Sequence, residues 1–326
     1  MRPRDEAVPR TARRGRNPLS AFEDRLVEEI RQLAEGPGAS AIVTGIGDDA
    51  AVWQPSRSHR SVVTTDAFVE NVHFKRDDSL ENAGRRAMAA SLSDVAAMGA
   101  RPVLATISLA LPAENAREDA LALYRGIAEC AQANACAIVG GDLTRAPLVA
   151  LAVTIVGEVR ASNVKLRSGA RPGDVVAVTG PLGAARAAGF CTVPTPRIAE
   201  GRWLAASASV RAMMDVSDGL STDLLRMCAL SKCGALIERV PVAPAVQAAA
   251  RAAGEEPENY ALAAGEDYEL LVAVKGRAFR YVAARFRKRF GRDLERVGIL
   301  RESAGVFRKV GAGEREVAAT GWDHFS

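Results

Sequence analysis

The chain has 326 residues, 48% of them hydrophobic, which is enough for two domains with cores of their own. Its net charge of +4 comes from the first sixteen residues, where six arginines stand against Asp5 and Glu6, so the remainder is neutral. Few aromatics and no second basic run argue against a nucleic-acid-binding protein. Five cysteines without a CxxC pair and only three histidines argue against a disulfide framework and a zinc site.

We expect the arginine-rich residues 1–18 to form a disordered, solvated basic arm. No apolar segment of a secretory signal follows it, and the apolar runs 103–111 and 148–156 are too short to span a bilayer. These features predict a cytoplasmic protein that binds neither membrane nor nucleic acid.

After the arm, hydrophobic periodicity predicts helices and strands in alternation. In chain order the first half reads helix 19–33, strands 41–46 and 61–65, helix 80–98, strand 103–111, helix 114–134 and strands 137–139 and 148–156. Hairpin-like and crossover connections are mixed here, which indicates an α+β fold rather than a strict alternation.

A polar stretch rich in glycine and proline, residues 160–174, interrupts this pattern and is the expected domain boundary. The second half continues with strand 175–179, a helix-prone region to residue 208, strand 212–216, a helix from Leu220 and further alternation to residue 297. We therefore predict an N-terminal domain over residues 19–159 and a C-terminal α/β domain over residues 160–326.

The stretch GIGDDAAV places Asp48 and Asp49 together between glycines and small apolar residues. It formally matches the looser dinucleotide fingerprint G-x-G-x-x-A, but two carboxylates would face the pyrophosphate there. Trp53-Gln54-Pro55 also leaves no room for the helix that this fingerprint needs. A simple Gly-Asp-Asp turn remains an alternative for this stretch taken alone.

Further aspartates sit where apolar elements meet tight turns or lie within an apolar face. They are Asp66 in TTDAFVENVHF, Asp94 in AASLSDVAAMGA, Asp142 in IVGGDLTR, and Asp215, Asp218 and Asp223 in MMDVSDGLSTD. Each alone could be structural, for example a helix cap at Asp142 or Asp218. As a set, with few basic residues nearby in sequence to neutralise them, they favour a hard cation held by oxygen ligands. Dispersed carboxylates suit Mg²⁺ bridging to substrate phosphates, which suggests a nucleoside triphosphate.

Neither a P-loop nor the protein-kinase motif set is present. Instead GIGDDAAV, TTDAFVENVHF, SLSDVAAMGA, GGDLTR, RSGARPGD, DVSDGLSTDL, GEDYELL and GWDHF occur in an order that resembles the thiamine-monophosphate kinases, from about residue 22 to residue 325. The wider group contains aminoimidazole ribonucleotide synthetase, selenophosphate synthetase and a hydrogenase-maturation protein. The ending GWDHF favours the thiamine-phosphate kinases, because a hydrogenase-maturation relative would end in cysteine and this chain ends in Ser326.

The resemblance implies two α/β domains of the PurM-like type, with a mixed or antiparallel N-terminal sheet used to form a homodimer. It implies that ATP is the co-substrate and that several Mg²⁺ ions are the cofactor. It implies no catalytic side chain, only residues that position the substrates and the metal. The implied metal ligands are Asp49, Thr64, Thr65, Asp66, Asp94, Asp142, Asp215 and Asp218. The implied ATP contacts are Gly141, Asp142, Arg167 and Ser217, and the implied contacts to thiamine monophosphate are His73, Glu266 and Trp322.

Three of these residues could instead have a purely structural role: His73 as an ordinary half-buried histidine, Arg167 as a solvated loop charge and Glu266 as a helix-start residue. The sequence departs from the family pattern in a shorter stretch between Gly180 and Met214, at the expected cleft rim, and in a tryptophan at position 322, where tyrosine is frequent.

The expected activity is ATP-dependent phosphorylation of thiamine monophosphate to thiamine diphosphate by direct in-line transfer. The alternatives are another enzyme of the wider group, acting through a phosphorylated amide or amidine, and a non-catalytic nucleotide-binding paralogue.

Overall fold

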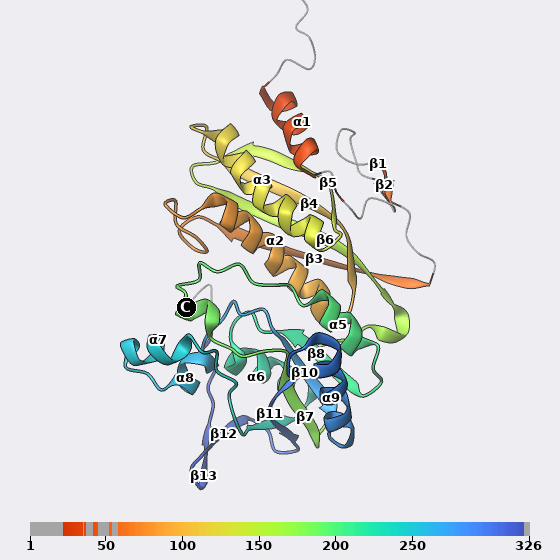
Figure 1. The fold of residues 1–326 in the computed structure, drawn as a ribbon, viewed down its shortest axis with the longest axis vertical. Coiled ribbons are helices and arrows are strands. Elements are labelled where there is room, and N and C mark those ends of the chain that lie inside the picture. The colour runs from red at the N-terminus through yellow and green to blue at the C-terminus, as the bar shows by residue number, and fades with distance from the viewer. Residues whose placement is uncertain (1–21, 35, 37–41, 45–51, 54–57, 323–326) are drawn as a thin grey trace, which may run out of the picture.

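The computed structural model describes residues 22–34, 36, 42–44, 52–53 and 58–322, which fold around two large β-sheets, one above the other in Figure 1. The chain starts with α1 (Phe22–Ala34) and a small sheet of β1 (Ile42–Thr44) and β2 (Val52–Trp53). The upper sheet belongs to the N-terminal half and the lower sheet to the C-terminal half.

The N-terminal sheet has four strands in the order β3-β6-β4-β5. Their bounds are β3 (His59–Val69), β4 (Arg101–Leu111), β5 (Ala137–Arg145) and β6 (Ala150–Arg160). The strand β6 pairs antiparallel with β3 and β4, whereas β4 and β5 run parallel, so the sheet is mixed, as the sequence predicts.

Two long helices, α2 (Leu80–Ala97) and α3 (Ala116–Ala133), cover one face of this sheet (Figure 1). They approach closely because each presents a glycine to the other: a Cβ on Gly84 would lie 2.2 Å from the Leu123 carbonyl oxygen, and one on Gly126 would lie 1.9 Å from that of Glu81. The α2 helix begins after Ser79, whose hydroxyl accepts a hydrogen bond from the Asn82 amide. The helix predicted over 80–98 is therefore confirmed.

The C-terminal sheet has seven strands in the order β13-β12-β9-β11-β7-β10-β8, all antiparallel except β9 and β12. Its strands are β7 (Asp174–Val178), β8 (Val210–Asp215), β9 (Gly234–Ile237), β10 (Leu270–Lys275), β11 (Glu295–Arg301), β12 (Val306–Val310) and β13 (Gly313–Glu316). The helices are α4 (Ala184–Ala187), α5 (Ile198–Ala205), α6 (Leu220–Ser231), α7 (Val246–Ala253), α8 (Pro257–Leu262) and α9 (Phe279–Phe290), with short 3₁₀ turns η3 (Ala161–Asn163) and η4 (Gly276–Ala278).

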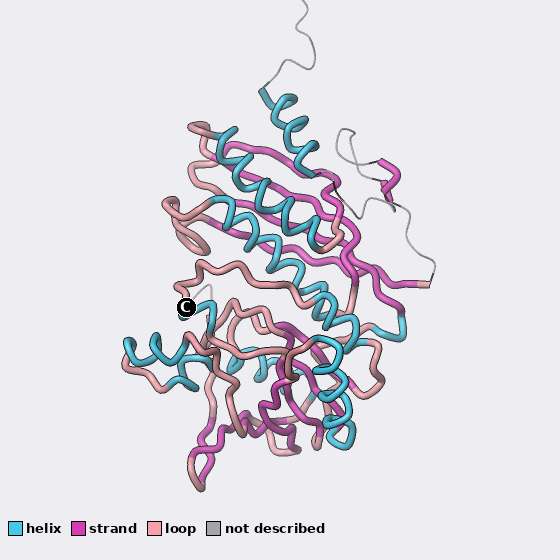
Figure 2. Tube along the Cα trace, in the orientation of Figure 1, coloured by secondary structure: helices cyan, strands magenta, loops and turns pink. Residues whose placement is uncertain are grey.

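Helices cover both faces of the central strands of this sheet, which explains their continuous apolar runs. On one face Met214 packs in a core with Leu224 of α6, and on the other Met213 packs with Leu204 of α5 and Phe286 of α9. The loop that joins α4 to α5 runs between the two halves of the molecule (Figure 2).

The helix α2 contributes to both halves. Its side chains Met88 and Leu92 belong to the N-terminal core, whereas Ala96 and Ala97 pack in the C-terminal cluster that contains Met213. Small residues at this end of α2 allow close packing, since a Cβ on Gly201 of α5 would lie 2.2 Å from the Ala96 carbonyl oxygen. Residues of α2 are therefore placed where the two halves meet.

Candidate active site

An acidic cluster forms where β3 meets α2. The Thr64 hydroxyl of β3 donates a 2.5 Å hydrogen bond to Asp94 Oδ2 of α2. Burial, and next the charge of Asp94, raise the pKa of Asp66 to about 6, and a hydrogen bond with the Ser91 side chain opposes this in part. Two carboxylates that resist ionising together are typical of sites that hold a cation.

Asp215 brings a carboxylate from the C-terminal half to the same place. It is the last residue of β8 and only 2% exposed, and its Oδ2 accepts a 2.8 Å hydrogen bond from the Ser93 hydroxyl of α2. Burial, and next the charge of Asp94, raise the pKa of Asp215 to about 7, while Arg167 acts in the opposite direction. Arg167, itself exposed, is thus close enough for its charge to act on the cluster.

Asp218 and Asp223 form a second acidic pair at the start of α6, and they share Arg226. The Arg226 guanidinium hydrogen-bonds to Asp218 Oδ2 and, at 3.0 Å, to Asp223 Oδ1. Asp223 Oδ2 also accepts a hydrogen bond from the Asp218 amide at 3.1 Å. Basic residues near the aspartate motifs are few in the sequence, but these two aspartates do have one, because one turn of helix brings Arg226 back to them.

The register of the N-terminal sheet decides which way its polar residues face. Asp66 pairs with Val153, which pairs with Ile107, which pairs with Gly141. Val153 and Ile107 belong to the core under α2 and α3, so this row faces the helices. A side chain at Gly141 would lie 2.0 Å from the Ile107 carbonyl oxygen, which explains the glycine there.

Asp142 lies on the other face of this sheet. It is exposed and pairs with the exposed Ser108, while the next residue, Leu143, packs against the helix-covered core. Thr65 faces the same way as Asp142, and its hydroxyl is 3.0 Å from that of Thr154. The structure thus brings Thr64, Asp66, Asp94 and Asp215 together but places Thr65 and Asp142 on the opposite face. The alternative of a helix cap at Asp142 is wrong, since Asp142 lies within β5.

The side chains gathered around Asp94 suit a hard cation, because they are a hydroxyl and carboxylates, two of which have raised pKa values. Within the part of the chain that the structure describes, no group of three or more His, Cys, Asp or Glu side chains converges closely enough to enclose a metal ion. Asp49 lies outside the described residues. The donor set therefore fits Mg²⁺ that is completed by water and substrate phosphates rather than a closed protein cage.

A second group of predicted site residues lies beside this cluster. The His73 ring stacks on Phe68 with centroids 4.7 Å apart, and its Nδ1 accepts a 3.1 Å hydrogen bond from the Val69 amide. Arg86 of α2 lies over the Phe68 ring, with Cζ 5.3 Å from the ring centroid, and donates a 2.7 Å hydrogen bond to Glu266 Oε2. Two residues predicted to contact the same ligand are thus linked across the two halves.

Glu266 lies in the loop between α8 and β10, not at a helix start, so that alternative is wrong. It has a left-handed φ of 60°, and its amide donates a 2.8 Å hydrogen bond to the Ser217 carbonyl. Two residues later Tyr268 also has a positive φ, of 49°, and donates to the Val216 carbonyl. Burial, and next the charges of Glu266 and Asp215, raise the pKa of Tyr268 well above its usual range.

The C-terminal segment lies against the start of α6. The Trp322 amide donates a 3.1 Å hydrogen bond to the Asp218 carbonyl, and the Gly321 amide donates one of the same length to the Thr222 hydroxyl. A Cβ on Gly321 would lie 1.9 Å from the Asp218 carbonyl oxygen, so this glycine permits the close approach. The Trp322 side chain is 52% exposed. The backbone of Trp322 is thus fixed beside Asp218, while residues 323–326 lie outside the described part.

Four residues that the sequence did not single out belong to this region: Ser93, which binds Asp215; Arg86, which binds Glu266; Arg226; and Tyr268. The available clue was a charged or hydroxyl residue inside an otherwise small and apolar helix. Such a residue is costly unless it has a partner, but the partners of Ser93 and Arg86 are more than a hundred positions away in sequence.

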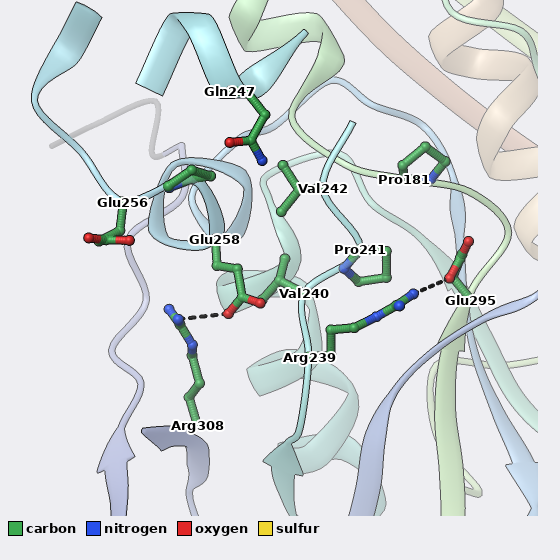
Figure 3. A pocket seen from close by; sticks show the side chains of 11 residues that line it. Pro181, Arg239, Val240, Pro241, Val242, Gln247, Glu256, Glu258, Glu295 and Arg308 are labelled. Carbon is green, nitrogen blue, oxygen red and sulfur yellow. Dashed lines mark hydrogen bonds and ion pairs between the residues drawn. The ribbon is translucent and has the colours of Figure 1, made fainter. Parts of the chain in front are cut away.

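A surface hollow of about 520 Å³ lies elsewhere, beside α7, α8 and the β12 strand of the C-terminal half (Figure 3). Four of its charged residues form ion pairs with one another, Arg239 with Glu295 and Arg308 with Glu258 (Figure 3). None of the predicted site residues lines it. We assign it no part in the chemistry.

Comparisons with known proteins identify the class to which this fold belongs. Residues 47–159 match the family model "AIR synthase related protein, N-terminal domain", and residues 185–310 match the corresponding C-terminal domain. The chain is therefore a two-domain protein of the AIR-synthase-related class. Escherichia coli HypE, a hydrogenase maturation protein, has the same fold, with a TM-score of 0.76 at 21% identity, covering 93% of this chain and 98% of its own.

Relatives with higher sequence identity identify the family within this class. A thiamine-monophosphate kinase of Rhodopirellula baltica is 39% identical over 287 residues, covering 84% of this chain and 89% of its own, and one of Bacillus subtilis is 33% identical, covering 71% and 77%. The crystal structure of the Stenotrophomonas maltophilia thiamine-monophosphate kinase has a TM-score of 0.76 at 32% identity, with 87% and 95% covered. AaThiL in complex with AMPPCP and TMP has a TM-score of 0.71 at 29% identity, with 83% and 89% covered. The chain belongs to the thiamine-monophosphate kinase family.

Proposed function

We propose that the protein is an ATP-dependent kinase that converts thiamine monophosphate to thiamine diphosphate, the last step of thiamine diphosphate biosynthesis. One observation supports this proposal: in a chain that belongs to this family, Asp66 of the N-terminal half and Asp215 of the C-terminal half both lie near enough to Asp94 for its charge to act on them. In AaThiL, the same fold binds AMPPCP and TMP.

The proposed reaction requires no strong general acid or general base from the protein. The acceptor is a phosphate that is already an anion at neutral pH, so positioning and charge neutralisation suffice for in-line transfer of the γ-phosphoryl group. Thr64, Asp66, Asp94 and Asp215 would hold Mg²⁺, with Asp49 and Asp218 as further ligands. Bound Mg²⁺ would neutralise phosphate charge that these carboxylates alone would repel.

The remaining residues divide between the two substrates. We assign Gly141, Asp142, Arg167 and Ser217 to ATP. His73, Glu266 and Trp322 are assigned to thiamine monophosphate. The Arg86 link between Glu266 and the Phe68–His73 stack supports a shared acceptor site.

Direct transfer has its own test. Protein incubated with γ-labelled ATP and Mg²⁺ but without acceptor should retain no label after denaturation, because no covalent intermediate forms. Label trapped on His73 or on an aspartate would replace direct transfer with a two-step mechanism.

We further propose a cytoplasmic homodimer formed through the open face of the N-terminal sheet. That face carries the 66% exposed Val63 together with Thr65 and Asp142, whereas α2 and α3 cover the other face. In the described residues no helix is long and apolar enough to cross a membrane. We also propose residues 19–159 and 160–326 as the domain limits. The arm predicted over residues 1–18 lies outside the described residues. Light scattering on the purified chain would measure the mass of the assembly.

The alternatives are tested by a panel of acceptors. An enzyme acting on an amide or amidine would consume ATP with such a compound and not with thiamine monophosphate. A non-catalytic paralogue would bind nucleotide without any turnover. We expect ADP release that depends on thiamine monophosphate, with thiamine diphosphate as the second product.

A further inference from the structure

We propose that Arg86 is a positioning residue of the acceptor site: it holds Glu266 of the C-terminal half in fixed relation to the Phe68–His73 stack of the N-terminal half. This inference rests on the proposed function, because it takes His73 and Glu266 as contacts to thiamine monophosphate. Arg86 itself comes from α2, the helix that packs in the cores of both halves.

The Arg86 side chain is unusually placed for a cation. The residue is only 4% exposed, and its one ion pair among the described residues is the 2.7 Å contact from Nη2 to Glu266 Oε2. Its Nε is buried and has no hydrogen-bond partner in the described part of the chain. A buried guanidinium with an unsatisfied donor contributes little to the free energy of unfolding, because its desolvation costs about as much as the ion pair gains. A role in the site accounts for its position better than a role in stability.

The aromatic contact ties Arg86 to the other half of the site. Its Cζ lies 5.3 Å from the centroid of Phe68, within the range of a cation–π interaction. Phe68 in turn stacks on His73 with an interplanar angle of 24°, and the Val69 amide fixes the Nδ1 of that ring. A shift of the guanidinium would therefore change its contact with Phe68, on which His73 stacks, and its hydrogen bond with Glu266 at the same time.

The ion pair also leaves part of Glu266 for a ligand. Arg86 engages Oε2, while no described residue donates a hydrogen bond to Oε1, and the side chain is 24% exposed. An N–H donor such as the amino group of an aminopyrimidine suits this oxygen. The Arg86 contact is the one side-chain hydrogen bond of this carboxylate among the described residues, and it fixes the direction of the carboxylate.

The neighbouring residue supplies a matched control. Arg85 lies on the same helix, but its guanidinium binds Glu81 of α2 and Glu129 of α3 on the surface. Arg85→Met thus removes the same charge and similar contacts one position away from the proposed site.

The test measures KM for each substrate, kcat and melting temperature in Arg86→Met, Arg86→Lys, Arg85→Met, Glu266→Gln and the double variant Arg86→Met/Glu266→Gln. Arg86→Met should raise KM for thiamine monophosphate by about tenfold to hundredfold, the range for one lost charged hydrogen bond, while KM for ATP stays within about twofold. Arg86→Lys should recover part of this loss, since it keeps the charge but not the planar fork. The double variant should be no worse than Glu266→Gln, and Arg85→Met should match the wild type.

Other results overturn the inference. Equal changes in both KM values, a lowered melting temperature with unchanged KM values, or additive effects in the double variant would show that Arg86 is structural. If Arg86→Met does not fold, Arg86→Lys decides: an unchanged KM for thiamine monophosphate contradicts the positioning role. A wild-type protein that does not convert thiamine monophosphate would instead reject the proposed function, and the acceptor role of Arg86 with it.

Discussion

The Ser93 hydroxyl donates a 2.8 Å hydrogen bond to Asp215 Oδ2, so a helix that covers the N-terminal sheet is tied to the last residue of a strand in the C-terminal sheet. Ser93 is the residue before Asp94, whose charge is the second cause of the raised pKa of Asp215. The carboxylates of Asp94 in α2 and Asp215 in β8 are thereby held close to each other. Their repulsion, relieved by a cation, is the physical basis of the predictions below.

Removing the Ser93 hydroxyl should weaken the affinity for Mg²⁺ in a pH-dependent way. That hydrogen bond lowers the pKa of Asp215, so Ser93→Ala should raise it further above about 7 and leave more of the carboxyl protonated at neutral pH. We expect the Mg²⁺ concentration for half-maximal rate to rise by roughly twofold to fivefold at pH 7, the effect of raising a pKa of about 7 by half to one unit, and to approach the wild-type value at pH 8.5. Mg²⁺ titrations at both pH values measure this, and a change that is the same at both would contradict the account.

Asp66→Asn should raise the melting temperature of the metal-free protein while lowering its turnover. The pKa of Asp66 in the folded protein is about 6, above its usual 3.8, so the folded state binds the proton more tightly than the unfolded state. Stability from this group is therefore present at low pH and is lost as the pH rises through about 6. Without metal, Asp66→Asn should melt about 2–5 °C higher than the wild type at pH 8, with a smaller gain at pH 5.

The same variant should lose turnover by about two to three orders of magnitude, the cost of a lost group that stabilises transition-state charge. Melting curves without metal and initial rates with Mg²⁺ give the two halves of the test. Lower stability at pH 8 together with full activity would remove Asp66 from the site.

Asp142 should behave differently because it faces away from the helices. Its side chain is exposed on the open face of the sheet, so Asp142→Asn should change the melting temperature by no more than about 1 °C. A role in binding nucleotide predicts a clear loss of rate nonetheless. Rates and light scattering, measured together, show whether that loss accompanies a change in assembly. Full activity would mean that the resemblance assigns Asp142 wrongly.

Trp322 is expected to stack on the acceptor, because its backbone is fixed beside Asp218 and its indole is half exposed. Thiamine monophosphate carries a permanently positive thiazolium, for which an indole face is the best side-chain partner. Trp322→Ala should raise KM for thiamine monophosphate by roughly threefold to thirtyfold and leave KM for ATP nearly unchanged. Trp322→Tyr should recover most of the affinity. Equal weakening of both substrates would make Trp322 a structural residue.

The sequence was sufficient for the order of the main elements, because amphipathic and β-branched runs such as those of α2 and β4 are strong local patterns. It failed at β5, predicted over 137–139 but running to Arg145, since Gly140 and Gly141 have no strand propensity of their own. They are extended because β4 pairs with them along its length. Local propensity could not foresee a partner strand.

The candidate site likewise has features that the sequence predicts and features that depend on distant parts of the chain. The aspartates could be found from their motifs, but not the faces on which they lie: Asp66 and Asp142 look alike in sequence, and only the strand register puts one under the helices and the other on the open face. The pairing of Arg86 with Glu266, residues 180 positions apart, could not be read from local patterns. The contact between Asp223 and Arg226 is different, because these residues are three positions apart in one helix and the pattern was open to a local reading.

The most direct test of the central claim is product analysis. Purified protein, ATP, Mg²⁺ and thiamine monophosphate are incubated and the thiamine compounds separated, with Asp66→Asn treated identically. The account predicts thiamine diphosphate and ADP in equal amounts from the wild-type protein, dependence on Mg²⁺, and a rate lower by about two to three orders of magnitude in the variant. ATP consumption without thiamine diphosphate, or product formed equally well by Asp66→Asn, would contradict it.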